Sequence, residues 1–311
     1  MKAQSIHVLG KTTWKSDFRM NWGVYLLFLP IFVYFIIFSY LPMFGIVMAF
    51  QDFNAVKGFF GSKFVGFSNF AAFFSGPSFS QVLRNTVVIS LLGLSAGMVT
   101  SIGFALLLNE IVFTKFKKTV QTISYLPYFV SMVVIAGLII EFTSTNGFIT
   151  NLLVNLFGMK RENLLLNPRY FWWINLATDI WQGMGYGSIV YIAAITGVSH
   201  EHHEAAAIDG ANRLQRVWHV ILPAIRPTIV TMLVMRMGML LTVGFEKILL
   251  LYSPTIYSTA DVISTHVTRM GLERMQYGYS AAVGLFNSVV GTLLLVGANM
   301  LSRKLTETSV F

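Results

Sequence analysis

Long apolar runs alternate with shorter polar segments along this chain. Six of these runs reach the length of roughly 20 residues that an α-helix needs to cross about 30 Å of hydrocarbon. They cover residues 23–50, 84–109, 121–141, 170–198, 228–251 and 281–302. The pattern predicts an all-α, polytopic membrane protein. Residues 23–302 would form a six-span transmembrane domain, and residues 1–22 and 303–311 would be short terminal segments.

The composition agrees with a membrane protein, since 55% of the residues are hydrophobic and only 11% are charged. The net charge of +9 is explained by basic loops held on one side of a bilayer, so we expect no nucleic-acid partner. The chain has no cysteine, which excludes disulfides and thiolate metal sites. The first run lacks a small-residue cleavage site, and we expect it to be retained.

The distribution of Lys and Arg predicts the orientation. Six spans place both termini on one side, and that side would hold Lys2, Lys11, Lys15, Arg19, Lys115, Lys117, Lys118, Arg213, Arg216, Arg226, Arg303 and Lys304. The opposite side would hold Lys57, Lys63, Arg84, Lys160, Arg161, Arg169, Lys247, Arg269 and Arg274. The first group is larger and clusters beside span ends, so the positive-inside rule predicts cytoplasmic termini.

The same orientation places residues 199–227 in the cytoplasm, between the fourth and fifth spans. Ser199 is expected to cap a helix that Gly210 ends, and a second helix would follow. Pro223 and Pro227 are expected to break or kink the entry into the fifth span. The three alanines before Ile208 would let the first helix settle into a groove on a partner, although an ordinary interfacial helix is the alternative.

Six positions of this segment carry a family resemblance: Glu204, Ala205, Ala206, Gly210, Leu222 and Pro223. Their spacing is similar to the EAA signature of binding-protein-dependent ABC importer permeases, with Val220 where that pattern has Ile. The resemblance implies a coupling helix that inserts into a separate ATPase subunit, with Glu204 as the acidic contact and Gly210 as the turn. It also implies the type I ABC importer permease fold.

Further segments, at 64–74, 83–86, 125–127 and 252–272, resemble the carbohydrate importers of maltose type, and most closely the aldouronate and alginate permeases. This resemblance implies a second, usually non-identical permease, two ATPase subunits and an extracytoplasmic sugar-binding protein. The complex would lie in the bacterial cytoplasmic (inner) membrane. The chain lacks the GxxxxGK[ST] phosphate loop, so ATP and Mg are expected on the partner ATPase and no cofactor on this chain.

Polar and aromatic residues within the spans are candidates for the substrate pathway, because sugars offer both hydroxyls and apolar ring faces. The candidates are Asp179, Trp181, Gln182, Tyr186, Tyr191, Arg236 and Glu246. Charged residues inside a span favour a functional role. Asp179 and Arg236 could instead form an internal ion pair or pair with the partner permease. Glu246 and Lys247 could simply be solvated at the end of the fifth span.

Two other classes of function stay open at this stage. A secondary transporter or channel would show inverted repeats or ion-coupling carboxylates at the centre of a span. A membrane enzyme acting on lipid or polysaccharide is suggested only by the HEHHE run at 200–204 and by scattered aromatic residues. That run fails the HExxH zinc pattern because position 204 is Glu, so we expect no metal site. The glycines at 183, 185 and 187 lie inside a predicted span, where close helix packing explains them better than phosphate binding.

Overall fold

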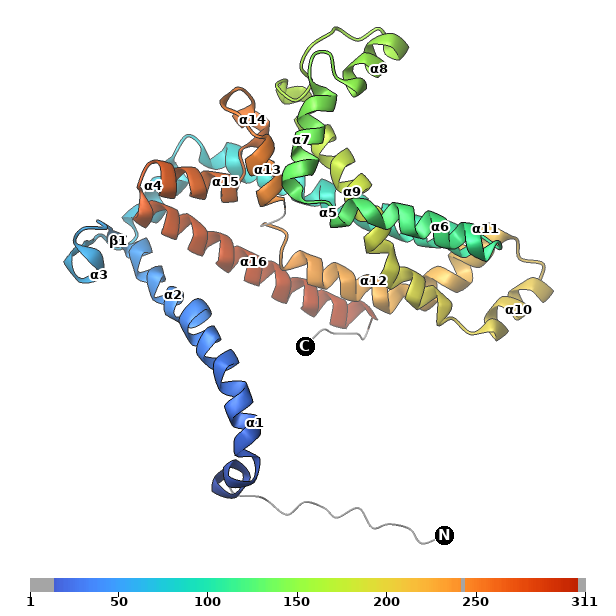
Figure 1. The fold of residues 1–311 in the computed structure, drawn as a ribbon, viewed down its shortest axis with the longest axis horizontal. Coiled ribbons are helices and arrows are strands. Elements are labelled where there is room, and N and C mark those ends of the chain that lie inside the picture. Colours follow the sequence, from blue (N-terminus) through green and yellow to red (C-terminus); the bar gives the residue numbers. More distant parts are fainter. Residues whose placement is uncertain (1–13, 242–243, 307–311) are drawn as a thin grey trace.

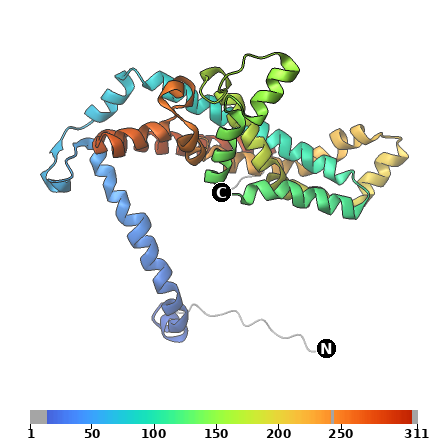
Figure 2. The same cartoon turned by 45° about the horizontal axis from the view of Figure 1, so that its top comes forward.

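The computed structural model describes residues 14–241 and 244–306, and helices dominate this part of the chain. The first helical run, Trp14–Phe50, comprises α1 (Trp14–Phe35), a π-helical turn (Ile36–Tyr40), α2 (Leu41–Met43) and a 3-10 segment (Phe44–Phe50). Figures 1 and 2 show α1 leaning away from the other helices, whereas the 3-10 segment at the end of the run packs against α16 and buries Ala49. No residue of α1 is buried, so lipid or another chain must surround this helix.

Two long helices form the centre of the remaining bundle. They are α5 (Phe79–Asn109) and α9 (Pro168–Thr196), and they pack along each other for much of their length. Helix α9 also packs tightly against α6 (Thr114–Tyr125). A Cβ at Gly185 of α9 would collide with the backbone of Ser124 on α6. Gly185, and Gly187 beside Ser101 of α5, therefore serve close helix approach as expected, whereas nothing lies within 4 Å of a Cβ at Gly183.

The third predicted span, 121–141, is wrong as one continuous helix. Helix α6 passes into a 3-10 turn (Leu126–Phe129), and α7 (Met132–Thr143) begins afresh with Ser131 as its N-cap. The Ser131 hydroxyl accepts a hydrogen bond from the backbone nitrogen of Val134 at 3.4 Å. Pro127 lies in the turn and cannot donate to an α-helical ladder, which explains the interruption. Helix α8 (Phe148–Phe157) follows after a short turn.

Five helical runs in the described residues are long and apolar enough to cross a membrane. They are Trp14–Phe50, Phe79–Asn109, Met132–Phe157, Arg213–Met237 and Tyr277–Lys304. The fourth predicted span, 170–198, forms the 29-residue helix α9 but is not among the five. This helix carries Asn175, Asp179 and Gln182, and these polar side chains lower its hydropathy while it packs against neighbouring helices.

The fifth predicted span, 228–251, is also divided. Helix α12 (Leu222–Met237) ends near Gly238, and α13 (Phe245–Leu251) begins after Gly244, whose φ is +78°. A left-handed residue of this kind favours glycine and ends the helical ladder. Helix α16 (Tyr277–Thr306) packs against α12 and forms the sixth predicted span without interruption.

Short elements fill the connections at one end of the bundle. Strands β1 (Gln51–Asp52) and β2 (Lys63–Phe64) pair antiparallel, and α3 (Gly58–Gly61) lies between them in sequence. Helix α4 (Ser68–Ser75) follows, and the segment after α13 forms a 3-10 turn (Pro254–Ile256), α14 (Tyr257–Ala260), α15 (Ile263–Thr268) and a π-helical turn (Arg269–Glu273). Helices α10 (His200–Ile208) and α11 (Arg213–Arg216) occupy the opposite end (Figure 1).

Candidate coupling surface and membrane pathway

Helix α10 begins and ends where the sequence predicts. The Ser199 hydroxyl accepts a hydrogen bond from the backbone nitrogen of Glu201 at 3.2 Å, which caps the first turn. Gly210 follows the helix with a φ of +74°. The backbone nitrogen of Ala211 then donates to the carbonyl of Ala206 at 2.9 Å, a bond that closes a Schellman-type end. Gly210 is thus the turn residue because its conformation requires no side chain.

The second half of the segment differs from the prediction, because no break separates it from the fifth span. Asn212 and Gln215 form a capping box with bonds of 2.8 and 2.9 Å. Helix α11 then continues through a π-helical turn (Val217–Ile221) into α12, as one run from Arg213 to Met237. Pro223 has no backbone N–H to donate. The π-helical turn before it accommodates this proline by shifting the backbone hydrogen-bond ladder by one residue.

The two helical pieces enclose a groove of about 760 Å³ at this end of the molecule. Its lining includes Ala205, Ala206, Gly210 and Pro223, so the structure brings four of the six signature residues together. Glu204 is exposed on α10, outside the lining. Leu222 instead packs against the buried cluster that contains Tyr191, Ile195, Ile221 and Ile225. This cluster joins the segment to α9 and α12.

Asp179 pairs with Lys247 and not with Arg236. The Lys247 Nζ lies 2.5 Å from Oδ1 of Asp179 and donates to the backbone carbonyl of Asn175 at 3.1 Å. Lys247 is only 1% exposed, so the expectation that it is solvated at a span end is wrong. Burial of an unpaired ammonium would be costly, and the ion pair with α9 compensates for it. Glu246, its neighbour, is exposed.

Arg236 lies between α12, α5 and α9. A Cβ at Gly97 would lie 3.3 Å from its Nη1, and a Cβ at Gly187 would lie 3.6 Å from its Nη2. The two glycines therefore leave the space that the guanidinium occupies. Tyr191 lies within electrostatic reach of Arg236, and its buried hydroxyl has no hydrogen-bond partner among the described residues.

The other two aromatic candidates, Tyr186 and Trp181, lie in different parts of the structure. Tyr186 stacks on Tyr128, with ring centroids 3.8 Å apart and an interplanar angle of 4°, and Phe129 meets it edge-on. Trp181 lines a different, apolar hollow of about 480 Å³ with Tyr170 and Trp173. Gln182 is half-buried on α9. Sequence reasoning missed Tyr128 because it lies in the turn between α6 and α7, beyond any periodic pattern.

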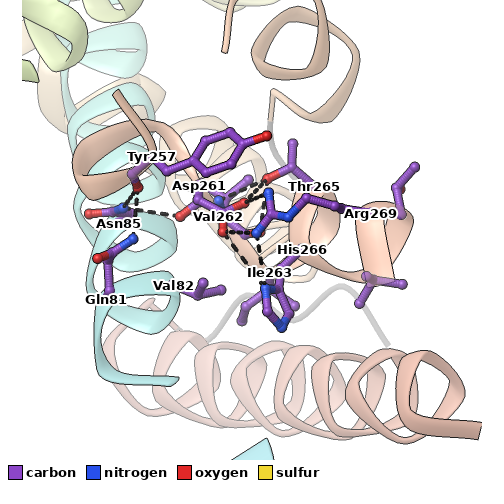
Figure 3. Close-up of polar contacts among 12 residues, drawn as sticks. Gln81, Val82, Asn85, Tyr257, Asp261, Val262, Ile263, Thr265, His266 and Arg269 are labelled. Atoms are coloured by element: carbon purple, nitrogen blue, oxygen red, sulfur yellow. Dashed lines mark hydrogen bonds and ion pairs between the residues drawn. The ribbon is translucent and has the colours of Figure 1, made fainter. Parts of the chain in front are cut away.

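A buried polar network fixes the segment after α13 against α5 (Figure 3). Arg269 forms a two-pronged ion pair with Asp261, with Nη1 2.9 Å from Oδ1. Asn85 on α5 donates to the backbone carbonyl of Asp261 at 3.0 Å. Burial by itself would raise the pKa of Asp261, but hydrogen bonds from His266, Arg269 and Thr265 hold that pKa below its ordinary value. The pKa of Arg269 is raised by the same pair, against its own burial.

Comparisons with known proteins identify the family. Residues 91–307 match the model of the binding-protein-dependent transport system inner membrane component. The chain is 39% identical to protein LplB of Bacillus subtilis strain 168, over 96% of this chain and 94% of LplB. It is 40% identical to the polygalacturonan/rhamnogalacturonan transport system permease protein YteP of the same organism, over 93% and 90%.

Two solved structures share the fold. One chain of a bacterial alginate ABC transporter, solved in complex with an alginate pentasaccharide-bound periplasmic protein, superposes with a TM-score of 0.87 at 41% identity, over 96% of this chain and 99% of that chain. A chain of a bacterial ABC transporter involved in the import of the acidic polysaccharide alginate gives 0.86 at 40% identity, over 94% and 99%. The chain therefore belongs to the binding-protein-dependent inner-membrane permease family, as the permease subunit of a carbohydrate importer.

Proposed function

We propose that residues 199–227 transmit motion from a separate ATPase to the sugar pathway. The observation that carries this proposal is the shape of the segment. Helix α10 stands at one extremity of the bundle (Figure 1), and Glu204 and Ala205 on it are exposed. Ile208 is 86% exposed at its end. An exposed apolar and acidic helix surface of this kind suits insertion into a groove on a partner.

The continuity between α11 and α12 supports transmission. One helical run extends from Arg213 to Met237, so a displacement of the docked end would move α12 as a unit. Its far end carries Arg236, which lies against α5 and α9. This run ends at Met237 and α13 begins as a separate helix at Phe245, and α13 is held to α9 by the Asp179–Lys247 pair. We infer that α12 moves relative to α13 during transport.

The assembly that we propose has a second, homologous permease, two ATPase subunits that carry ATP and Mg, and an extracytoplasmic sugar-binding protein. The exposed apolar surface of α1 supports contact with the second permease or with the lipid bilayer. Both termini would be cytoplasmic in a bacterial inner membrane, because Lys115, Lys117 and Lys118 then lie on the cytoplasmic side.

The sugar pathway would pass along the surface where α5, α9 and α12 meet. Arg236 offers its guanidinium there. Gln182 and Tyr186 on α9 would extend the pathway toward the turn between α6 and α7, where Tyr128 stacks on Tyr186. Trp181, on the hollow with Tyr170 and Trp173, is a weaker candidate for sugar contact. Asp179 would act through its pair with Lys247. The names of YteP and of the alginate transporter support an oligosaccharide derived from a polysaccharide of the polygalacturonan, rhamnogalacturonan or alginate kind.

The coupling role is tested with Glu204→Lys and Gly210→Pro in the complete complex, reconstituted in proteoliposomes. Both variants are expected to insert and assemble, while ATP hydrolysis no longer drives uptake. Gly210→Pro is severe because proline cannot adopt a positive φ. Glu273→Lys makes the same charge change at an exposed glutamate in the turn Arg269–Glu273, at the opposite end of the molecule, and as the matched control it should retain coupled uptake. Normal coupling in Glu204→Lys and Gly210→Pro would remove the docking role.

A further inference from the structure

The side chain of Arg236 lies in a space between α12, α5 and α9. Arg236 lies one residue before the end of α12, within the fifth predicted span. Gly97 on α5 and Gly187 on α9 approach its two terminal nitrogens from different helices. A Cβ at Gly97 would press on the guanidinium at 3.3 Å, whereas a Cβ at Gly187 would touch it at 3.6 Å and collide with Ser101 of α5. The side chain therefore has a defined place at the junction of three helices.

The positive charge of Arg236 has no counter-ion in the described part of the chain. Asp179 lies close to the same surface of α5, since a Cβ at Gly93 would be 3.8 Å from its Oδ2. The charge of Asp179 is already neutralised by Lys247. No ion pair among the described residues includes Arg236. A cation at membrane depth without a partner is costly and points to a ligand that supplies the anion.

The surroundings of Arg236 define what that ligand must offer. The Tyr191 hydroxyl near Arg236 has no hydrogen-bond partner among the described residues, but it is buried and does not line the hollow beside the guanidinium. Beside the guanidinium lies a hollow of about 400 Å³ whose other walls are apolar. These walls are Gly93, Leu94, Met232, Met235, Met239 and Leu240. A ligand with one anionic group and an apolar ring face matches this set.

We propose that Arg236 is a carboxylate-binding site in the pathway and selects oligosaccharides that contain uronic acid residues. This inference rests on the proposed pathway between α5, α9 and α12. A guanidinium binds a carboxylate through two parallel hydrogen bonds, and the apolar surroundings strengthen them by excluding water. A neutral sugar leaves the cation unpaired, so the site discriminates by the charge of the substrate and not only by its size.

The test compares each acidic trisaccharide with its carboxyl-reduced form, which differs only in having CH₂OH in place of the carboxylate. Trigalacturonate and trimannuronate are measured by equilibrium dialysis against the permease–ATPase complex in nanodiscs, without the binding protein. The wild type should bind at least one acidic form about 10-fold more tightly than its reduced form. Arg236→Gln should weaken acidic binding by roughly 10- to 100-fold and leave the reduced form unchanged.

Arg236→Lys keeps the charge without the planar fork, and should retain part of the preference. Arg169→Gln removes an exposed cation and should behave as the wild type. Equal binding of acidic and reduced sugars by the wild type, or an unchanged preference in Arg236→Gln, would overturn the inference.

ATP hydrolysis stimulated by the binding protein is measured in parallel. If the binding protein does not stimulate ATP hydrolysis in the wild type, the proposed function is contradicted. If stimulation persists in Arg236→Gln while its preference for acidic sugars changes, the effect belongs to Arg236.

Discussion

Lys247 on α13 forms a buried ion pair with Asp179 on α9, and its Nζ lies 2.5 Å from Oδ1 of that carboxylate. The same ammonium donates to the carbonyl of Asn175 on α9. Two residues that are 68 positions apart in sequence thus connect the fourth predicted span with the second half of the fifth. The pair thus fixes α13, which begins at Phe245 as a helix separate from α12.

Lys247→Met is expected to destabilise the complex by leaving Asp179 without its cation. The Asp179 side chain is 30% exposed, so leaving it unpaired should cost less than the roughly 3 kcal/mol of a fully buried pair, and removing both charges should cost less still. The midpoint of thermal unfolding in detergent should therefore fall in Lys247→Met and recover substantially in Asp179→Leu combined with Lys247→Met. Equal midpoints for the single variant and the wild type would show that the pair does not hold α13.

Gly185→Ala is expected to destabilise the packing of α9 on α6. The added Cβ would meet the backbone of Ser124, which cannot turn aside as a side chain could. Overpacking of this kind costs about 1–3 kcal/mol. Gly183→Ala is the matched control, because nothing lies within 4 Å of its Cβ position. A drop in unfolding midpoint for Gly185→Ala alone would confirm the contact, and equal midpoints would contradict it.

The segment 252–280 should lose stability in acid. The pKa of Asp261 is lowered in the folded state relative to its ordinary value of 3.8. The ionised Asp261 carboxylate therefore contributes to stability above about pH 4. This contribution disappears as the pH falls through the lowered pKa of the folded state. Limited proteolysis of this segment should increase in that range. Asp261→Asn should be cleaved more readily at neutral pH and show little further change on acidification.

Single-cysteine variants test the orientation, and the natural chain contains no cysteine that would interfere. Phe60→Cys lies in the connection between β1 and β2, fully exposed, and Ile208→Cys lies at the end of α10. A membrane-impermeant maleimide should label Phe60→Cys in intact spheroplasts. It should label Ile208→Cys only after the membrane is opened. The reverse pattern would invert the proposed topology.

The sequence alone determined the class of protein because membrane insertion depends on the length and apolarity of local runs, which are visible without a fold. It also determined both boundaries of α10, since a serine cap and a left-handed glycine act on neighbouring backbone groups. The EAA spacing placed the segment in a family, and the comparisons confirmed that family. The assignment of Glu204 and Gly210 to ATPase docking stays a prediction.

The tertiary structure decided which charged residues meet. Nothing local distinguishes Lys247 from a solvated residue at a span end, and only the approach of α13 to α9 buries it against Asp179. The same approach of helices leaves Arg236 beside Gly97 and Gly187 without an ion pair in the described residues. Breaks at Ser131 and Gly244 divide two spans that hydropathy joins. Pairing of charges depends on contacts between distant segments, and such contacts exist only once the helices have packed.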